Sequence, residues 1–347
     1  MANQSTLKEY LFRSAQDLPN GNNLASLLLA ITECTKSIAH LISQGALSQI
    51  TAKLSTTNVQ GETQMQLDVL TNDLFIATLE CSGLVAGAVS EELDEPYLFK
   101  GKEAAPFLVA FDPLDGSSNI AVNVSVGSIF CILPSNTLST QHEINSTNYL
   151  QSGVAQMAAG YVLYGPATML VLTTGKGSHG FTLDVSSQEF LLTHSNIQIP
   201  EVTSEFAINA SNQRFWEPPV KRYVSECCDG ITGLRERDFN MRWVASMVAD
   251  VHRILMRGGV YLYPKDKKLP AKAGRLRLLY EANPMSFIVE QAGGKSSTGR
   301  ERILQLTPSQ IHERVPVILG SYSEVCLIEL YHDEFDVHLL EEYSLSI

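Results

Sequence analysis

The spacing of apolar residues along the chain predicts amphipathic helices in three stretches. Leu, Ile and Val recur every three or four positions over residues 23–43, 67–80 and 244–257, which is the period of a helix with one buried face. The pair Gly258-Gly259 ends the third stretch, because glycine accepts the left-handed conformation that closes many helices. Asn283-Pro284 predicts a further helix start, with Asn as the cap and Pro in the first turn. Residues 323–330 open the last predicted helix.

Short apolar runs between these helices predict buried strands. In the first half they cover residues 84–89, 107–111, 126–133 and 168–172, followed by a hairpin with alternating pattern over 177–192. In the second half they cover 206–209, 260–263 and 315–319. A polar, proline-containing stretch at 194–204 separates the two halves. The alternation of strands and helices on both sides predicts an α/β or α+β protein with two domains, 1–199 and 200–347.

One long segment has neither pattern. Residues 46–66 are rich in Ser, Thr, Gln and Asn and have few apolar residues that could anchor them. We interpret this segment as a mobile loop of the kind that closes over a binding site.

The composition of the chain excludes several classes of protein. The chain has 347 residues, 44% of them hydrophobic and 18% charged, which is typical of a globular protein and excludes disorder for most of its length. A net charge of −12 argues against a nucleic-acid partner. No stretch reaches the ~18–20 apolar residues of a membrane span, and no signal peptide is expected. The six cysteines form no CxxC pair, and Cys227-Cys228 is interpreted as structural, which favours a reducing cytoplasm.

The densest candidate chemistry lies at the ends of two predicted strands. Asp112 and Asp115 stand three apart after an apolar run, with Pro113 stiffening the turn and Gly116 allowing a ligand to approach the backbone. Ser117 and Ser118 add donors suited to phosphate oxygens. A turn with Asx-type hydrogen bonds would explain the same residues without any ligand.

Other acidic residues join this pair. Glu91 and Glu92 follow the strand 84–89, where an exposed acidic turn is the simpler interpretation. Glu281 lies in an apolar run, where it would bind a metal or form a salt bridge to Arg275 or Arg277. Asp68 is a further candidate. Such an all-oxygen set favours Mg²⁺ or Mn²⁺ over Zn²⁺ and predicts metal-assisted phosphoryl transfer to water.

The second half of the chain contains basic residues that are suited to binding an anion. Six of them lie between residues 265 and 277, and we interpret those up to residue 272 as a solvated face. Arg275 and Arg277 alternate with leucines, so both point to one side of an extended segment suited to a phosphate. Arg242 precedes the helix 244–257.

Two segments carry a family resemblance. Residues 111–119 (FDPLDGSSN) and 274–285 (GRLRLLYEANPM) closely resemble class I fructose-1,6-bisphosphatases, and shorter matches extend the likeness from about residue 23 to about residue 328. The DPLDGS core is shared with the wider lithium-sensitive phosphatase superfamily, whereas RLRLLYE is much more specific to the fructose bisphosphatases. The resemblance implies a layered α-β-α-β-α sandwich whose two domains join near residue 200.

The resemblance also implies roles for individual residues. Two or three Mg²⁺ ions, or Mn²⁺, would be held by Glu91, Asp112, Asp115, Glu281 and the carbonyl of Leu114. Catalysis would rest on Asp68 and Glu92, which orient the nucleophilic water and take its proton, and on Glu62 of the mobile loop. The substrate would be bound by Asp115, Gly116, Ser117, Ser118, Asn209, Arg242, Tyr263 and Arg275. In the family the Arg matching Arg242 reaches across a subunit interface, which implies a homo-oligomer, usually a tetramer.

Some positions depart from the family pattern. Trp243 stands where the family usually has a Tyr that hydrogen-bonds the 6-phosphate, and Arg275 replaces a usual Lys. The positions that bind inhibitory AMP in mammalian members read Pro106-Phe107, Pro134 and about Ala25 here, so weak or absent AMP inhibition is expected. The chloroplast regulatory loop is missing.

The expected activity is hydrolysis of D-fructose 1,6-bisphosphate to fructose 6-phosphate and phosphate, in gluconeogenesis or Calvin-type sugar phosphate metabolism. Sedoheptulose 1,7-bisphosphate, alone or as a second substrate, remains an alternative because of Trp243. A non-catalytic sugar-phosphate sensor is a third possibility, against which the intact set of carboxylates argues.

Overall fold

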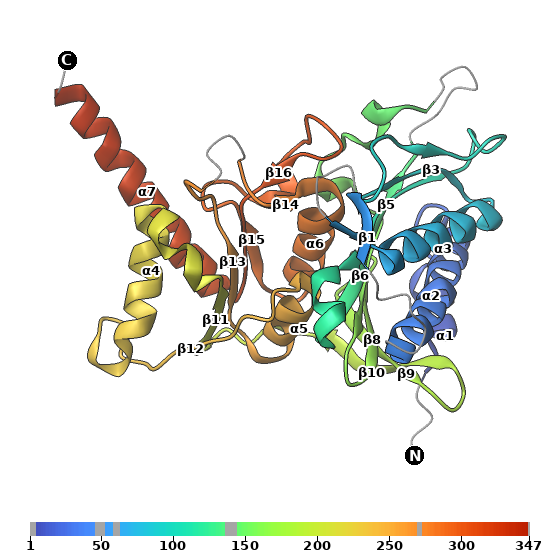
Figure 1. Ribbon diagram of the computed structural model, residues 1–347, viewed down its shortest axis with the longest axis horizontal. Helices are drawn as coiled ribbons and strands as arrows, with labels where there is room; N and C mark the ends of the chain where they lie inside the picture. Colours follow the sequence, from blue (N-terminus) through green and yellow to red (C-terminus); the bar gives the residue numbers. More distant parts are fainter. Residues whose placement is uncertain (1–4, 46–52, 58–62, 136–143, 269–272, 346–347) are drawn as a thin grey trace.

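The chain folds into five layers, alternately helical and β. The computed structural model describes residues 5–45, 53–57, 63–135, 144–268 and 273–345, the side chains of 53–57, 63–65 and 339–345 excepted. From right to left in Figure 1, the layers are three helices, a large sheet, two helices, a smaller sheet and two outer helices. This is the α-β-α-β-α sandwich that the resemblance implied.

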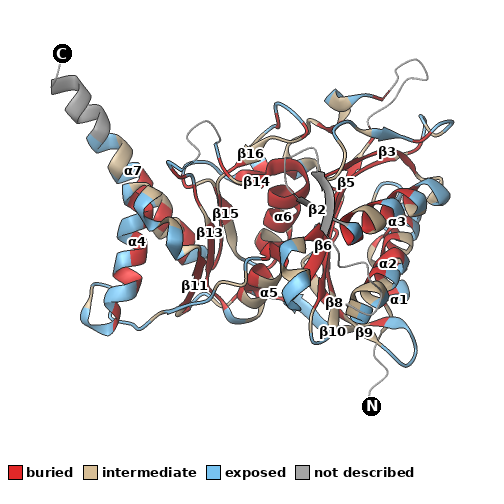
Figure 2. Cartoon of the chain, viewed as in Figure 1, coloured by how far each residue is buried: buried red, intermediate tan, exposed pale blue. Residues whose placement is uncertain are grey.

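The large sheet has eight strands in the order β10-β9-β8-β7-β6-β5-β3-β4. All neighbours are antiparallel except β3 and β5, which run parallel. The strands are β3 (Val85–Ser90), β4 (Tyr97–Leu98), β5 (Phe107–Asp115), β6 (Val126–Pro134), β7 (Ala158–Tyr164), β8 (Thr168–Thr173), β9 (Ser178–Asp184) and β10 (Glu189–Ile197). Every residue of β3, β5 and β7 is buried, since helices cover both faces of the sheet (Figure 2), which explains their continuous apolar runs.

Helices α1 (Leu7–Ser14), α2 (Gly21–Gln44) and α3 (Gln66–Ser82) cover one face of this sheet, and α5 (Met247–Arg257) and α6 (Asn283–Gln291) cover the other. The second sheet has the order β12-β11-β13-β17-β15. Its strands are β11 (Glu205–Ile208), β12 (Asn240–Met241), β13 (Val260–Tyr263), β15 (Lys295–Ser297) and β17 (Val317–Gly320). Because α5 and α6 also contact this sheet, the middle helices share one core with strands of both sheets.

Two smaller pairs of strands and several short turns complete the described chain. β1 (Lys53–Thr57) pairs with β2 (Thr63–Met65), and β14 (Leu276–Arg277) pairs with β16 (Arg314–Val315). The 3₁₀ turns are η2 (Ser117–Val122), η3 (Ser146–Tyr149), η4 (Gly153–Ala155), η5 (Ala210–Phe215), η6 (Gly230–Thr232) and η8 (Ile303–Gln305), and η7 (Leu278–Ala282) is a π-helical turn.

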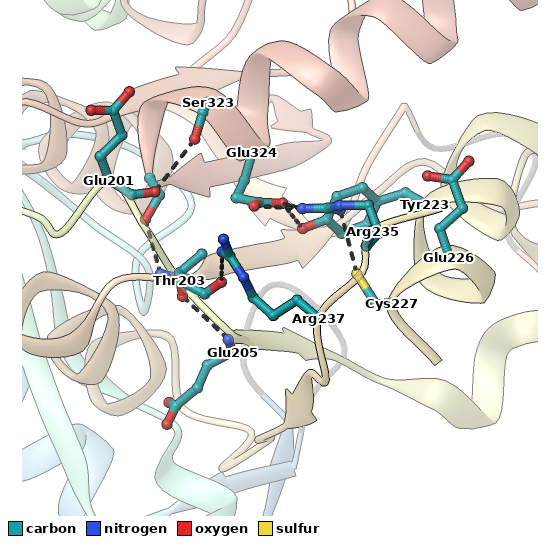
Figure 3. Close-up of polar contacts among 12 residues, drawn as sticks. Glu201, Thr203, Glu205, Tyr223, Glu226, Cys227, Arg235, Arg237, Ser323 and Glu324 are labelled. Atoms are coloured by element: carbon teal, nitrogen blue, oxygen red, sulfur yellow. Dashed lines mark hydrogen bonds and ion pairs between the residues drawn. The ribbon is translucent and has the colours of Figure 1, made fainter. Parts of the chain in front are cut away.

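The outer layer consists of α4 (Pro218–Asp229) and α7 (Tyr322–Leu345), which pack on each other and on the second sheet. Buried polar contacts reinforce this packing (Figure 3). Arg235 donates to both carboxylate oxygens of Glu324 in α7, at 2.6 and 2.8 Å, and the hydroxyl of Tyr223 in α4 donates to the same carboxylate at 2.6 Å. This charge-assisted set fixes the start of α7 against α4.

Several sequence-based predictions are corrected by the structure. The helix predicted over 244–257 begins at Met247, because Ser246 caps it by accepting from the amide of Ala249. Asn283 does not cap α6, since η7 leads into that helix without a break. Pro316 divides the predicted strand 315–319 into β16 and β17, which belong to different sheets. The elements α1, β7 and α4 were not predicted.

Two expectations about long segments also change. The predicted loop 46–66 contains the β1–β2 pair and the first residue of α3, and its other residues lie outside the described part of the chain. Helix α2 has the length, and a mean hydropathy of 1.3, that a membrane span requires, contrary to the expectation that no such stretch exists. Its residues Leu24, Leu28 and Ile31 are fully buried in the core between the helices and the first sheet. We therefore interpret α2 as a core helix.

Candidate active site

Most of the predicted site residues line one cavity of about 540 Å³ between the two sheets. The predicted residues that line it are Asp68, Glu91, Glu92, Asp112, Leu114, Asp115, Gly116, Ser117, Ser118, Asn209, Tyr263, Arg275 and Glu281. Arg242 is exposed and does not line this cavity, and Glu62 lies outside the described residues. Tertiary structure therefore brings together residues that are more than 200 positions apart in the sequence.

The parallel pairing of β3 and β5 places two of the acidic segments side by side. Ser90 pairs with Phe111, so Glu91 and Asp112 follow at the same end of neighbouring strands. Carboxylate oxygens of Asp112, Asp115 and Glu281 lie within 4.8 Å of one another, and all three side chains are buried. Glu281 reaches them from η7, a local π-helical turn of the kind that often marks a functional site.

Arg277 provides positive charge within this acidic cluster. Its Nη1 lies 2.6 Å from Glu91 Oε1 and 3.7 Å from Glu281 Oε2, and its backbone amide donates to Glu281 at 2.6 Å. The salt bridge that we considered as the alternative role for Glu281 is thus present, in addition to its place in the cluster. Arg277 lines the cavity but is committed to these carboxylates, which corrects its interpretation as a phosphate ligand alone.

Asp115 is held by the first turn of α5. The hydroxyl of Ser246 donates to it at 2.7 Å, and the amides of Val248 and Met247 donate at 2.9 and 3.3 Å. Amides at a helix N-terminus favour negative charge, so α5 favours the ionised form of this carboxylate and fixes its direction.

The cluster is costly to ionise in the absence of a cation. Burial, and then the charges of Glu91, Asp115 and Glu281, raise the pKa of Asp112 well above its usual value. Burial also raises the pKa of Asp115, against the hydrogen bonds from α5, and the pKa of Glu281 to about 7, against the charge of Arg277. Buried like charges at this spacing are stabilised by a bound cation. The all-oxygen donor set fits a hard divalent ion such as Mg²⁺.

The turn after Asp115 requires glycine at one position. Gly116 has φ +74°, and a Cβ there would lie 2.7 Å from the Cβ of Ser246. The turn between the two aspartates also contains an Asx-type hydrogen bond, from the amide of Leu114 to Asp112 at 2.9 Å. The Asx-type turn that we considered as the alternative is therefore present within the site, and Ser117 and Ser118, which follow it, line the cavity.

Aromatic and basic side chains form the opposite wall of the cavity. The ring of Trp243 packs against both Tyr261 and Tyr263 of β13, with ring centroids 5.8 and 5.7 Å away, and the two tyrosine centroids are 6.4 Å apart. Arg275 lies near them and pairs with Asp266 at 3.1 Å, so its guanidinium is held in place. Asn209 caps η5 at the same wall.

Sequence reasoning missed two residues of this wall. Tyr261 shares a face of β13 with Tyr263, so the two-residue period of a strand could have indicated it. Arg314, which donates to the carbonyl of Arg275 at 2.9 Å, comes from β16 and carries no local signal.

The two remaining candidate catalytic carboxylates lie beside the acidic cluster. Asp68 is in the first turn of α3 and is buried, and Glu92 follows Glu91 in the turn after β3 and is half-buried. Both line the cavity. The acidic turn that we took as the simpler interpretation begins only at Asp94 and Glu95, which are exposed. All six cysteines are free, and Cys227 is buried between α4 and Arg235, in accord with a structural role.

Comparisons with known proteins agree with this site. Family models described as "Fructose-1-6-bisphosphatase, N-terminal domain" and "C-terminal domain" match residues 5–195 and 199–333. A class 1 fructose-1,6-bisphosphatase of Hydrogenophilus thermoluteolus is 53% identical over 338 residues, covering 96% of this chain and 94% of the relative.

Solved structures show the same fold. A fructose-1,6-bisphosphatase of Leishmania major in its holo form is 38% identical, with a TM-score of 0.87 over 95% of this chain and 99% of that one. The apo form of that enzyme gives 37% identity and a TM-score of 0.82, over 95% of this chain and 100% of that one. From the two matching family models and this identity, the chain belongs to the fructose-1,6-bisphosphatase family of metal-dependent phosphoric monoester hydrolases.

Proposed function

We propose that this protein hydrolyses the 1-phosphate ester of D-fructose 1,6-bisphosphate, giving fructose 6-phosphate and phosphate. The observation that carries the proposal is the polarity of the cavity. The same cavity is lined by the buried acidic cluster with the Gly116–Ser118 turn and by a second set of groups, Arg275, Asn209 and the aromatic wall. A sugar with a phosphate at each end fits such a cavity, since each phosphate meets its own set of positive or hydrogen-bonding groups.

Different residues of the site bind the substrate and accept the proton. The turn at Gly116, Ser117 and Ser118 binds the reacting phosphate, while Arg275 and Asn209 orient the distant phosphate and the sugar. Asp68 and Glu92, next to the acidic cluster, orient the attacking water and accept its proton. Arg277 and the α5 N-terminus keep the cluster carboxylates fixed, so little reorganisation accompanies the reaction.

Glu91, Asp112, Asp115, Glu281 and the carbonyl of Leu114 would hold the metal ions. Two or three Mg²⁺ ions, with Mn²⁺ as an alternative, would make the attacking water more acidic and neutralise charge on the leaving oxygen. The buried, like-charged carboxylates support this assignment, since a cation relieves their repulsion.

Sedoheptulose 1,7-bisphosphate is not favoured as the substrate, because the relatives that match the whole chain are named as fructose-1,6-bisphosphatases. A role in sugar phosphate metabolism in the cytoplasm is part of the proposal and is supported by the six free cysteines.

A homotetramer is also proposed, with Arg242 completing the site of a second copy. The exposure of Arg242 outside the cavity of its own chain supports this arrangement. The proposed domain division near residue 200 is supported by the sheets, since β3 to β10 precede it and β11 to β17 follow it.

The test is phosphate release from fructose 1,6-bisphosphate, with Mg²⁺ and with EDTA, by the wild type, Asp112→Asn and Asp73→Asn. Asp112 belongs to the cluster, whereas Asp73 lies on the exposed side of α3 and serves as the matched control. We expect kcat to fall by several orders of magnitude for Asp112→Asn and to stay at the wild-type value for Asp73→Asn. Full activity of the wild type in EDTA, or of Asp112→Asn in Mg²⁺, would contradict the proposal.

A further inference from the structure

A histidine outside the cavity connects two of the segments that carry the acidic cluster. His312 precedes β16 and is half-buried. Its Nε2 donates to the backbone carbonyl of Asp94 at 3.2 Å, and its Nδ1 accepts from the hydroxyl of Tyr280 at 2.8 Å. The two rings meet edge to face, with centroids 5.8 Å apart. His312 therefore links the turn after β3 to the π-helical turn η7.

Each of the two segments carries ligands of the proposed metal site. Tyr280 immediately precedes Glu281 in η7 and is fully buried, so its hydroxyl is fixed relative to that carboxylate. Asp94 lies two residues after Glu92, in the connection from β3 to β4 that begins with the Glu91–Glu92 turn. The start of this turn is tied to the sheet by the amide of Glu91, which donates to the carbonyl of Phe111 at 3.2 Å. The connection is exposed at Asp94, where the hydrogen bond from His312 adds a link to the second half of the chain beside the ion pair of Glu91 with Arg277.

The contact with Asp94 requires a proton on Nε2, because a carbonyl cannot donate, and in the neutral ring Nδ1 then accepts from the hydroxyl of Tyr280. Burial lowers the pKa of His312, which favours this neutral form. The ring thus holds an acceptor, Nδ1, and a donor, Nε2, at a fixed distance from each other.

We infer that His312 is a positioning residue, which holds the Glu91–Glu92 turn against η7 so that the carboxylates of the two halves of the chain converge on one metal site. This inference rests on the proposed function. Removal of a group that hydrogen-bonds directly to a metal ligand typically changes metal affinity or activity by about 10- to 100-fold, and this range is the upper limit for His312, which contacts the neighbours of the ligands. The contacts of His312 do not reach the wall formed by Trp243 and Arg275, so substrate affinity should be little affected.

The chain contains a matched control for a merely structural role. Tyr161 in β7 and His252 in α5 form the same contact, from the hydroxyl to Nδ1 at 2.8 Å, again with an edge-to-face ring arrangement. Neither residue lines the cavity. Loss of this pair should lower stability without changing the metal site.

The experiment compares His312→Asn, His312→Gln and His252→Asn in the full-length protein. Asn keeps an acceptor near Nδ1 but loses the donor to Asp94, whereas Gln keeps an N–H near the position of Nε2. The measurements are kcat, KM for fructose 1,6-bisphosphate, the unfolding temperature, and the Kd of Mg²⁺ for the substrate-free protein by titration calorimetry.

For His312→Asn we expect a Kd for Mg²⁺ raised about tenfold, a kcat lowered about 10- to 100-fold and a KM within about threefold of wild type. His312→Gln should recover most of this loss, and His252→Asn should change only the unfolding temperature. Equal Mg²⁺ affinity in His312→Asn and His252→Asn, or a Gln variant as impaired as the Asn variant, overturns the inference.

A second variant tests the same inference if His312→Asn does not fold. Tyr280→Phe keeps the buried ring and removes only the hydroxyl that orients His312, so Mg²⁺ affinity should fall several-fold in the same direction. Unchanged Mg²⁺ affinity in Tyr280→Phe also overturns the inference. Calorimetry separates this result from the proposed function, because wild type that binds Mg²⁺ but releases no phosphate contradicts only the latter.

Discussion

The buried acidic cluster should make the metal-free protein less stable as pH rises, and Glu281→Gln should remove much of that effect. Burial raises the pKa of Glu281 from 4.5 to about 7, so between these values the folded protein binds a proton that the unfolded chain has released. The contribution of Glu281 to stability therefore falls with increasing pH across this window and is lowest above pH 7. The neutral amide of Gln cannot ionise, so the variant lacks this loss.

The size of this change in the free energy of unfolding follows from the shift in the pKa of Glu281. One pH unit is worth about 1.4 kcal/mol, so the full effect of Glu281 is ~3 kcal/mol once the pH exceeds 7. The charge of Glu281 also raises the pKa of Asp112, so its removal relieves Asp112 and acts in the same direction.

The assay is urea unfolding of EDTA-treated wild type, Glu281→Gln and Glu95→Gln at pH 5 and pH 8. From pH 5 to pH 8 the wild type should lose about 2 to 3 kcal/mol more than Glu281→Gln. Glu95 is exposed outside the cluster, so its variant should follow the wild type. Addition of Mg²⁺ at pH 8 should stabilise the wild type, by about 2.7 kcal/mol at 100 times Kd, and Glu281→Gln much less. Metal-free wild type and Glu281→Gln that change equally in stability over this range would refute the reasoning.

Three further outcomes are expected. Gly116→Ala should lower kcat/KM and destabilise the protein by at least about 1 kcal/mol, because its Cβ would meet Ser246 in a backbone conformation that glycine favours; unchanged kinetics would contradict the role of this turn. Arg235→Met should reduce the free energy of unfolding by about 3 to 5 kcal/mol, since it leaves the buried carboxylate of Glu324 uncompensated, while kcat of the folded protein stays unchanged. AMP at micromolar concentration should not inhibit, because the ring of Phe107 is fully buried in the core where the mammalian family has an AMP ligand; inhibition in a titration would disprove this.

Much of the fold follows from local pattern. The continuous apolar runs of β5 and β6 and the helical period of α2 identify these elements because each is buried on the faces that the pattern indicates. The apolar pattern did not predict the ends of elements that are set by tertiary contacts. α5 begins at Met247 because Ser246 turns to bind both Asp115 and the first turn of the helix. Glu281 lies in a π-helical turn that no periodicity predicts.

The sequence alone determined the chemistry of the protein. The DPLDGSS segment combines two carboxylates, a glycine and two hydroxyls within seven residues, which favours a cation and a phosphate as ligands. The tertiary structure decided which distant residues complete this site. Parallel pairing sets Glu91 beside Asp112, and the middle helical layer brings Arg277 and Glu281 against them. It also decided that Arg277 pairs with the acidic cluster, whereas Arg275 lies at the aromatic wall and pairs with Asp266. The sequence predicts only that the two arginines share one face of an extended segment, so it could not predict these different roles. The physical reason is that burial and neighbouring charge, which fix the role of each ionisable group, arise only when segments far apart in the chain pack together.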